Sequence, residues 1–170
     1  MNEVIALLRD LLALKINDAM TLALPLSPEN FEKVSQHYGN RDRRYKSGIH
    51  AGTDFAVPVG TPLYAIFDGT ITSMQKNHPD MGNVFYFTFQ FKDVWYTARY
   101  MHLSALPQRL QYAKGEQIAL SGTTGKVTGP HLHLDIQRDA QKFRPARLLT
   151  ETAVRQFMVD PYLFLKAHSV

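Results

Sequence analysis

Residues 3–22 carry apolar side chains at a helical spacing. Charged residues lie mostly between the apolar positions, which are Val4, Leu8, Leu11, Leu12, Ile16, Ala19 and Met20. We therefore expect an N-terminal amphipathic helix that packs against the main body of the protein. A membrane-surface helix or a helix that binds a partner is the alternative. Pro25 and Pro28 then break the chain into a linker, so we assign residues 1–30 to the helix and linker and residues 31–170 to one domain.

From about residue 48 the pattern becomes typical of short strands. Runs rich in Val, Ile, Phe, Tyr and Thr alternate with turn residues, and the candidate strands are 53–57, 62–66, 70–75, 84–91, 94–102, 116–120 and 131–137. The two residues between 84–91 and 94–102 indicate a hairpin. We expect a mainly β fold, an antiparallel β-sandwich or barrel-like core, with the N-terminal amphipathic helix and a short C-terminal helical insert at 150–157.

Composition removes several classes of protein. The chain has 170 residues, enough for one compact domain, and no cysteine, which excludes disulfides, Cys-type zinc fingers, iron–sulfur clusters and a Cys nucleophile. A net charge of +4 favours polyanionic partners only weakly, and no recognised nucleic-acid module accompanies it, so we expect no nucleic-acid partner. Arg9 and Asp10 interrupt the first apolar run, which does not fit a secretion signal, and no segment is apolar for long enough to span a bilayer.

The motif His131-Leu132-His133 suggests a functional strand. Side chains alternate along a strand, so both histidines face one side while the leucines face the other, where they can enter a core. Two imidazoles side by side are suited to a metal or catalytic site. Two exposed histidines on a solvated strand are the alternative.

A second motif, His50-Ala-Gly-Thr-Asp54, supplies another imidazole and a carboxylate, which are suitable zinc ligands. Residues four apart in an extended strand are separated by about 13 Å, so the chain must bend, most easily at Gly52. Asp54 could instead be an ordinary turn carboxylate. Together the motifs offer two histidine ligands and one aspartate. His131, the other member of the pair, would then stand beside the ion, and His102 could face it from the other side. Three protein ligands with one open position are typical of a catalytic zinc site.

These motifs occur in an order that resembles the lysostaphin/LytM-type zinc metallopeptidases, which cleave peptide bonds in the stems or cross-links of bacterial peptidoglycan. The similar segments run from His50-Ala-Gly-Thr-Asp54-Phe and Pro58-Val-Gly-Thr-Pro-Leu-Tyr-Ala65 through Tyr100-Met-His102-Leu-Ser and Gly115 to Gly125. They end with Thr128-Gly-Pro-His131-Leu-His133-Leu and Asp160-Pro-Tyr162, and they cover about residues 35–165.

The resemblance implies a zinc cofactor held by His50, Asp54 and His133, with His102 and His131 as the catalytic pair. It also implies a zinc metallopeptidase domain over residues 31–170 and a substrate in the cell wall, in the periplasm or outside the cell. Because no signal peptide is visible, we expect a trimmed chain, a phage-borne enzyme or delivery by another machine. The N-terminal helix and the long stretch 138–158 depart from the family pattern. Either could bind a partner protein, and the stretch could instead cap one end of the groove.

Two other functions compete with the peptidase. Some relatives have lost ligands and act only as activators of other wall hydrolases, but all five His and Asp positions are present in this chain. Sugar-transport phosphocarriers also use a histidine pair, yet they do not need Asp54 beside His50. The basic run Arg41, Arg43, Arg44 and Lys46 could hold anionic wall polymers or form a solvated loop. We expect no function for His37, His78 and His168, and tight turns at the glycines of 115–129.

Overall fold

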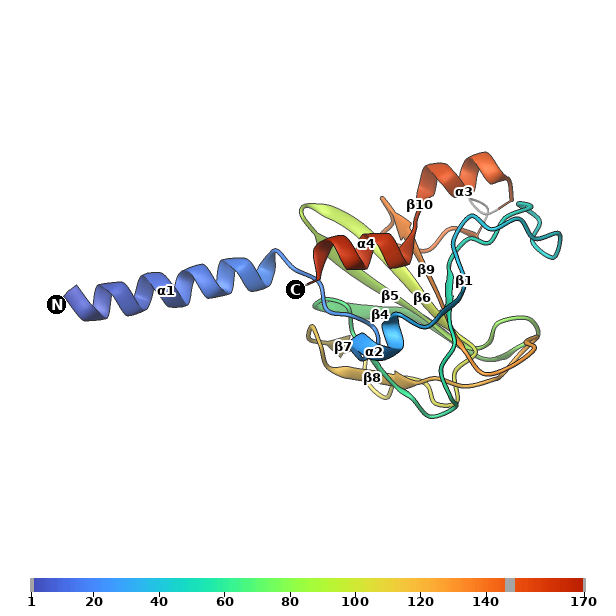
Figure 1. Cartoon of the computed structure of the whole chain (residues 1–170), viewed down its shortest axis with the longest axis horizontal. Coiled ribbons are helices and arrows are strands. Elements are labelled where there is room, and N and C mark those ends of the chain that lie inside the picture. The colour runs from blue at the N-terminus through green and yellow to red at the C-terminus, as the bar shows by residue number, and fades with distance from the viewer. Residues whose placement is uncertain (1, 146–148, 170) are drawn as a thin grey trace.

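The centre of the molecule is an antiparallel sheet, shown in Figure 1. The computed structural model describes residues 2–145 and 149–169. Seven strands follow one path, in the order β1 (Val34–Gln36), β2 (Thr53–Phe55), β9 (Leu132–Arg138), β6 (Val94–Met101), β5 (Gly82–Phe91), β4 (Gly69–His78) and β7 (Gln111–Tyr112). The eighth strand, β10 (Met158–Val159), also pairs with β9, while β3 (Pro62–Tyr64) and β8 (Gln117–Leu120) form a small second sheet.

The predicted mainly β, antiparallel fold is confirmed. Each of the seven candidate strands has a counterpart, although several are shorter than expected. The predicted helical insert is also present, as α3 (Glu151–Phe157). Within the described residues β1 and β7 are the two edges of the main sheet and do not pair with each other, so the sheet is open rather than a closed barrel.

The predicted hairpin joins β5 to β6, with Phe91 opposite Val94. Its two loop residues, Lys92 and Asp93, have φ angles of 49° and 61°. Positive φ at both positions is the signature of a type I′ turn, whose twist matches that of the flanking strands. The two-residue connection therefore fixes the register of the two central strands.

One face of the sheet forms the hydrophobic core. Alternate residues of β5 and β9 point into it, namely Phe85, Phe87, Phe89, Phe91, Leu132, Leu134 and Ile136. The small β3–β8 sheet, α2 (Pro28–Phe31) and α4 (Pro161–His168) add Leu63, Ile118, Phe31 and Leu165 to the same cluster. These contacts leave the opposite face of the sheet for polar chemistry.

The opposite face carries hydroxyl, amide and charged side chains. Thr88 and Thr97 lie 3.0 Å apart through their hydroxyl oxygens, and Thr97 donates to the carbonyl of Ala140. Gln137 is fully buried, and it donates to and accepts from the backbone of Arg144. The stretch after β9 is therefore fastened across this face.

The N-terminal helix, α1 (Asn2–Ala19), differs from the expectation. It projects away from the body in Figure 1, so the prediction that it packs against the body is wrong. Its apolar side chains are largely exposed; Leu7 is 69% exposed and Leu14 is 67% exposed. Helical spacing predicted the helix correctly but does not say what its apolar face contacts. No described helix is long and apolar enough to cross a membrane.

Residues 22–26 pack into the core although they were assigned to the linker. Leu22 and Leu26 are buried in the main cluster, and Ala23 donates its backbone N–H to Ile66. The division at residue 30 stays a prediction, but the contacts of the body begin at Thr21, whose carbonyl and hydroxyl oxygens accept from Lys114.

Candidate metal and catalytic site

Three side chains converge at one end of β9. Asp54 of β2 lies opposite His133 of β9 in the antiparallel ladder, and His50 precedes β2. The His133 Nδ1 atom lies 2.7 Å from Asp54 Oδ1 and 3.0 Å from His50 Nε2, and His50 Nε2 lies 3.3 Å from Asp54 Oδ1. The three donor atoms thus form a small triangle, as expected for side chains that share one ion.

Gly52 makes this convergence possible. A Cβ atom there would lie 2.4 Å from the Leu134 carbonyl oxygen and 2.8 Å from His133 Nε2. The chain bends at this residue, but without a positive φ. The glycine is therefore required by the close approach of the two backbones rather than by a left-handed turn.

The remaining ring nitrogens orient the two histidines. His50 Nδ1 lies 3.1 Å from the carbonyl oxygen of His37, and His133 Nε2 lies 3.3 Å from Asp135 Oδ2. With a metal bound, an N–H donated to each of these oxygens would leave His50 Nε2 and His133 Nδ1, the two nitrogens that face Asp54, as lone-pair donors. Such secondary hydrogen bonds are typical of metal-ligating histidines.

The donor set fits a zinc ion. Two imidazole nitrogens and one carboxylate oxygen are a common catalytic zinc set, and ligand bonds of about 2.0–2.1 Å in a tetrahedron require donor separations of about 3.3–3.4 Å. The observed separations of 2.7, 3.0 and 3.3 Å need only small outward shifts to reach that value. All three residues are buried, which limits competition from water.

A buried ion pair supports His133 from behind. Asp135 is fully buried, and Arg99 of β6 donates to it from Nε at 3.1 Å and also from Nη2. The guanidinium lies over the ring of Phe143, 4.2 Å from its centroid. The carboxylate that holds His133 is thus fixed by charge, and the stretch after β9 covers the pair.

His102 and His131 stand beside the three donors. Their ring centroids are 4.7 Å apart, and His131 Nε2 lies 3.9 Å from Asp54 Oδ1. His102 Nδ1 lies 2.9 Å from the Thr124 carbonyl oxygen, and His131 Nδ1 lies 2.9 Å from that of Gly129. Each ring can therefore donate from Nδ1 and keep Nε2 free.

His102 is held in a strained backbone conformation. Its φ is 63°, which is uncommon for a residue other than glycine, and its N–H donates to the Met81 carbonyl. Strain of this kind costs about 1–3 kcal/mol and is concentrated at functional sites. The strained residue follows β6 directly and points its ring at the centre.

Electrostatics separate the protonation states of these groups. Burial would raise the pKa of Asp54, but hydrogen bonds from His133 and His50 outweigh it and hold that pKa well below its usual range. Burial would lower the pKa of His133, but Asp135 and Asp54 raise it to about 9. Burial lowers the pKa of His102 to about 4, so this imidazole is neutral at pH 7.

The basic run before His50 lies close to the site. The ring of Tyr45 packs 5.3 Å from that of His50, and burial raises the tyrosine pKa. Arg44 is paired with Asp42, and Arg41 lies 3.7 Å from Glu151. Part of the run is thus engaged in ion pairs.

Sequence reasoning missed the supporting residues Asp135 and Arg99. The signal for Asp135 was present, because it lies two residues after His133 and therefore on the same face of β9. Arg99 had no such signal, since its position depends on the pairing of β6 with β9. All five predicted site residues lie in this cluster, while His78 and His168 contact other parts of the chain.

Comparisons with known proteins identify relatives of this chain. The chain is 46% identical over 89 residues to peptidoglycan DD-endopeptidase ShyA of Vibrio cholerae, covering 51% of this chain and 20% of that protein. It is 34% identical over 122 residues to the DD-endopeptidase ShyC of the same organism, covering 69% and 27%. The chain thus spans only about a fifth to a quarter of the length of these relatives.

Solved structures show the same fold. A zinc-containing peptidase from Vibrio cholerae matches with a TM-score of 0.63 and 27% identity, over 84% of this chain and 39% of that one. The catalytic domain of lysostaphin from Staphylococcus simulans matches with a TM-score of 0.63 and 27% identity, over 83% and 98%. The model of peptidase family M23 matches residues 48–145, more than half of the sequence, and the chain belongs to this family.

Proposed function

We propose that this chain is a zinc-dependent endopeptidase that hydrolyses peptide bonds in the stems or cross-links of peptidoglycan. The observation that carries the proposal is the triangle of His50 Nε2, Asp54 Oδ1 and His133 Nδ1, with a second histidine pair beside it. Membership of family M23 and the names of the most similar relatives support the same activity and the same substrate.

In this proposal His50, Asp54 and His133 hold the ion. Once zinc displaces the proton on the Asp54 side of His133, the other ring nitrogens of the two histidines can still donate to His37 and Asp135 and keep both rings oriented. A bound zinc ion would polarise the scissile carbonyl and lower the pKa of a water molecule. Burial of all three ligands strengthens these electrostatic effects.

His102 and His131 are the proposed catalytic residues. A neutral His102 can accept a proton through Nε2, because its Nδ1–H is engaged with the Thr124 carbonyl. His131 is held in the same way by Gly129 and is partly exposed, so it can contact a substrate. The pair can move a proton and stabilise the negative charge that develops on the carbonyl oxygen.

Metal analysis together with muropeptide mass spectrometry tests the proposal. We expect one equivalent of zinc and new peptide ends after digestion of purified peptidoglycan. His102→Ala and His131→Ala should retain zinc and lose most of the activity, whereas His133→Ala should lose the metal. His168→Ala, at the end of α4, is the matched control and should change neither. Zinc without any hydrolysis would favour a non-catalytic activator of other wall enzymes.

We further propose that the protein acts at the cell wall and that α1 docks a partner protein. The apolar residues that α1 exposes, including Leu8 at 59% and Leu12 at 59%, support a docking role. Leu8→Glu with Leu12→Glu should leave the hydrolysis of a soluble muropeptide unchanged and abolish association with the partner. The stretch 138–158 is a weaker candidate, because its Phe143 is already packed against Arg99.

A further inference from the structure

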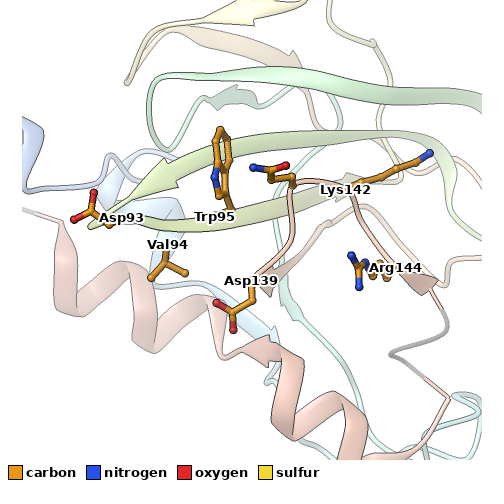
Figure 2. Close-up of a pocket in the computed structure, with 7 residues that line it drawn as sticks. Asp93, Val94, Trp95, Asp139, Lys142 and Arg144 are labelled. Carbon is orange, nitrogen blue, oxygen red and sulfur yellow. The ribbon is translucent and has the colours of Figure 1, made fainter.

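A pocket of about 480 Å³ lies at the end of the sheet remote from the histidines. It is lined by the β5–β6 turn and by the residues that follow β9, and Figure 2 shows Trp95 projecting from the hairpin. In that view Asp93 lies on one side of the indole, and Lys142 and Arg144 lie on the other. The pocket shares no residue with the metal and catalytic cluster.

The backbone around the pocket is fixed. Asp93 and Asp139 both have positive φ angles, 61° and 53°, at the two turns that border it. The N–H of Ala140 donates to the Trp95 carbonyl at 3.2 Å, and Thr97 donates to the Ala140 carbonyl at 2.8 Å. These bonds attach the loop to the hairpin, so the pocket is formed before a ligand arrives.

The chemistry of the lining suits a sugar ring. Trp95 is 37% exposed, and its flat apolar surface can stack on the C–H face of a pyranose. The carboxylates of Asp93 and Asp139 can accept hydrogen bonds from sugar hydroxyls, and Gln141 and Arg144 can donate to an acetamido carbonyl. An apolar platform surrounded by a few polar groups is the usual composition of a small-molecule site.

The pocket lies on the same face of the sheet as the catalytic cluster. Along β6, Trp95 and Arg99 are separated by an even number of residues and therefore share a face, and Arg99 contacts Asp135 behind His133. Met101, the β6 residue opposite His133, is six residues from Trp95, or about 20 Å along the strand. Between these two residues Ala140 and Phe143 cover Thr97 and Arg99, so a stem peptide would run over the stretch after β9 rather than along the strand itself.

The geometry points to a glycan subsite: Trp95 and the polar groups around it bind an N-acetylated sugar of the glycan strand whose stem peptide reaches the histidines. This inference rests on the proposed peptidoglycan substrate. It assigns the stretch after β9 a role in recognition, because that stretch supplies four of the seven residues that line the pocket.

Trp95 is the only tryptophan of the chain, so its fluorescence reports directly on the pocket. The probes are a disaccharide that carries a tetrapeptide stem, the free disaccharide and the free tetrapeptide, each titrated into the inactive His131→Ala variant. We expect a saturable change of emission with both sugar-bearing probes and none with the free peptide. No change with either sugar probe at millimolar concentration would overturn the inference.

Kinetics on the active protein provide a second readout. Trp95→Ala should raise KM about tenfold for cross-linked muropeptides that carry sugar, leave kcat unchanged, and have no effect on the same cross-linked peptides without sugar. Trp95→Phe should restore most of the affinity, and Leu110→Ala, another exposed apolar residue, is the control. An equal loss on both substrates would overturn the subsite and leave the peptidase proposal intact. An emission response together with no hydrolysis by the wild-type protein would support the subsite and overturn the peptidase proposal.

Discussion

The buried pair of Arg99 and Asp135 should affect stability and metal affinity separately. Arg99→Met removes the cation and leaves the fully buried carboxylate of Asp135 with His133 as its remaining partner. Loss of one partner of a buried ion pair costs about 3–5 kcal/mol, because the remaining charge stays desolvated. The double variant Arg99→Met/Asp135→Leu removes both charges, so most of that loss in the free energy of unfolding should be recovered.

Zinc affinity should follow a different course. Asp135 accepts the hydrogen bond that fixes the His133 ring, and loss of such a partner lowers metal affinity about 10- to 100-fold. The double variant should therefore regain stability but bind zinc more weakly than the wild type. Recovered stability together with a defect in metal binding would separate orientation of the ligand from packing of the sheet.

Urea unfolding with chelator present measures the free energy of unfolding, and competition with a chromophoric chelator measures the zinc affinity. With an m-value of about 2 kcal/mol/M, Arg99→Met should lower the midpoint by about 1.5–2.5 M. Arg155→Met breaks an exposed pair with Glu151 and should cost at most about 1 kcal/mol. Wild-type zinc affinity in the double variant would refute the role assigned to Asp135.

Three further predictions follow from the same geometry. In metal-free protein the pKa of His133 is raised to about 9, so its proton competes with zinc. Zinc affinity should therefore rise about tenfold per pH unit between pH 7 and 9 and then level off. The protonated His133 also stabilises the metal-free fold fully below about pH 6.5, and this contribution is lost as pH rises through 9; a flat profile of zinc affinity in chelator competition would contradict both expectations. Gly52→Ala should abolish zinc binding, measured as metal content, because a Cβ meets the Leu134 carbonyl, whereas Gly129→Ala has open space and should retain the metal. Lys92→Asn should raise the thermal midpoint, by about 0.5 kcal/mol of stability, because asparagine tolerates positive φ; a lower midpoint would argue against the turn assignment.

The sequence predicted those features that depend on local periodicity. Alternation in 131–137 placed the histidines on one face and the leucines in the core, and the two residues between 84–91 and 94–102 predicted the hairpin that is observed. The bend at Gly52 was expected as well. Glycine is required there because a Cβ would be crowded against Leu134, not because the turn is left-handed.

Features that depend on pairing between distant strands were not accessible in this way. The very short strands β1, β7 and β10 have two or three residues each, too few to show a period. Arg99 became part of the site only because β6 pairs with β9, 36 residues further along the chain. The helical pattern of α1 was read correctly, but amphipathicity alone does not say whether the apolar face meets the body or another molecule.

Strand β9 explains why the site is rigid. Leu132, Leu134 and Ile136 anchor one face of the strand in the core with no exposed surface, while His133 and Asp135 occupy the other face between β2 and β6. A rotation of His133 would break its hydrogen bond to Asp135, and a shift of the strand would expose the leucines. The ligands are therefore oriented by protein contacts that the metal does not supply. Because little ordering remains for the binding step, metal binding loses little free energy to fixing the ligand side chains.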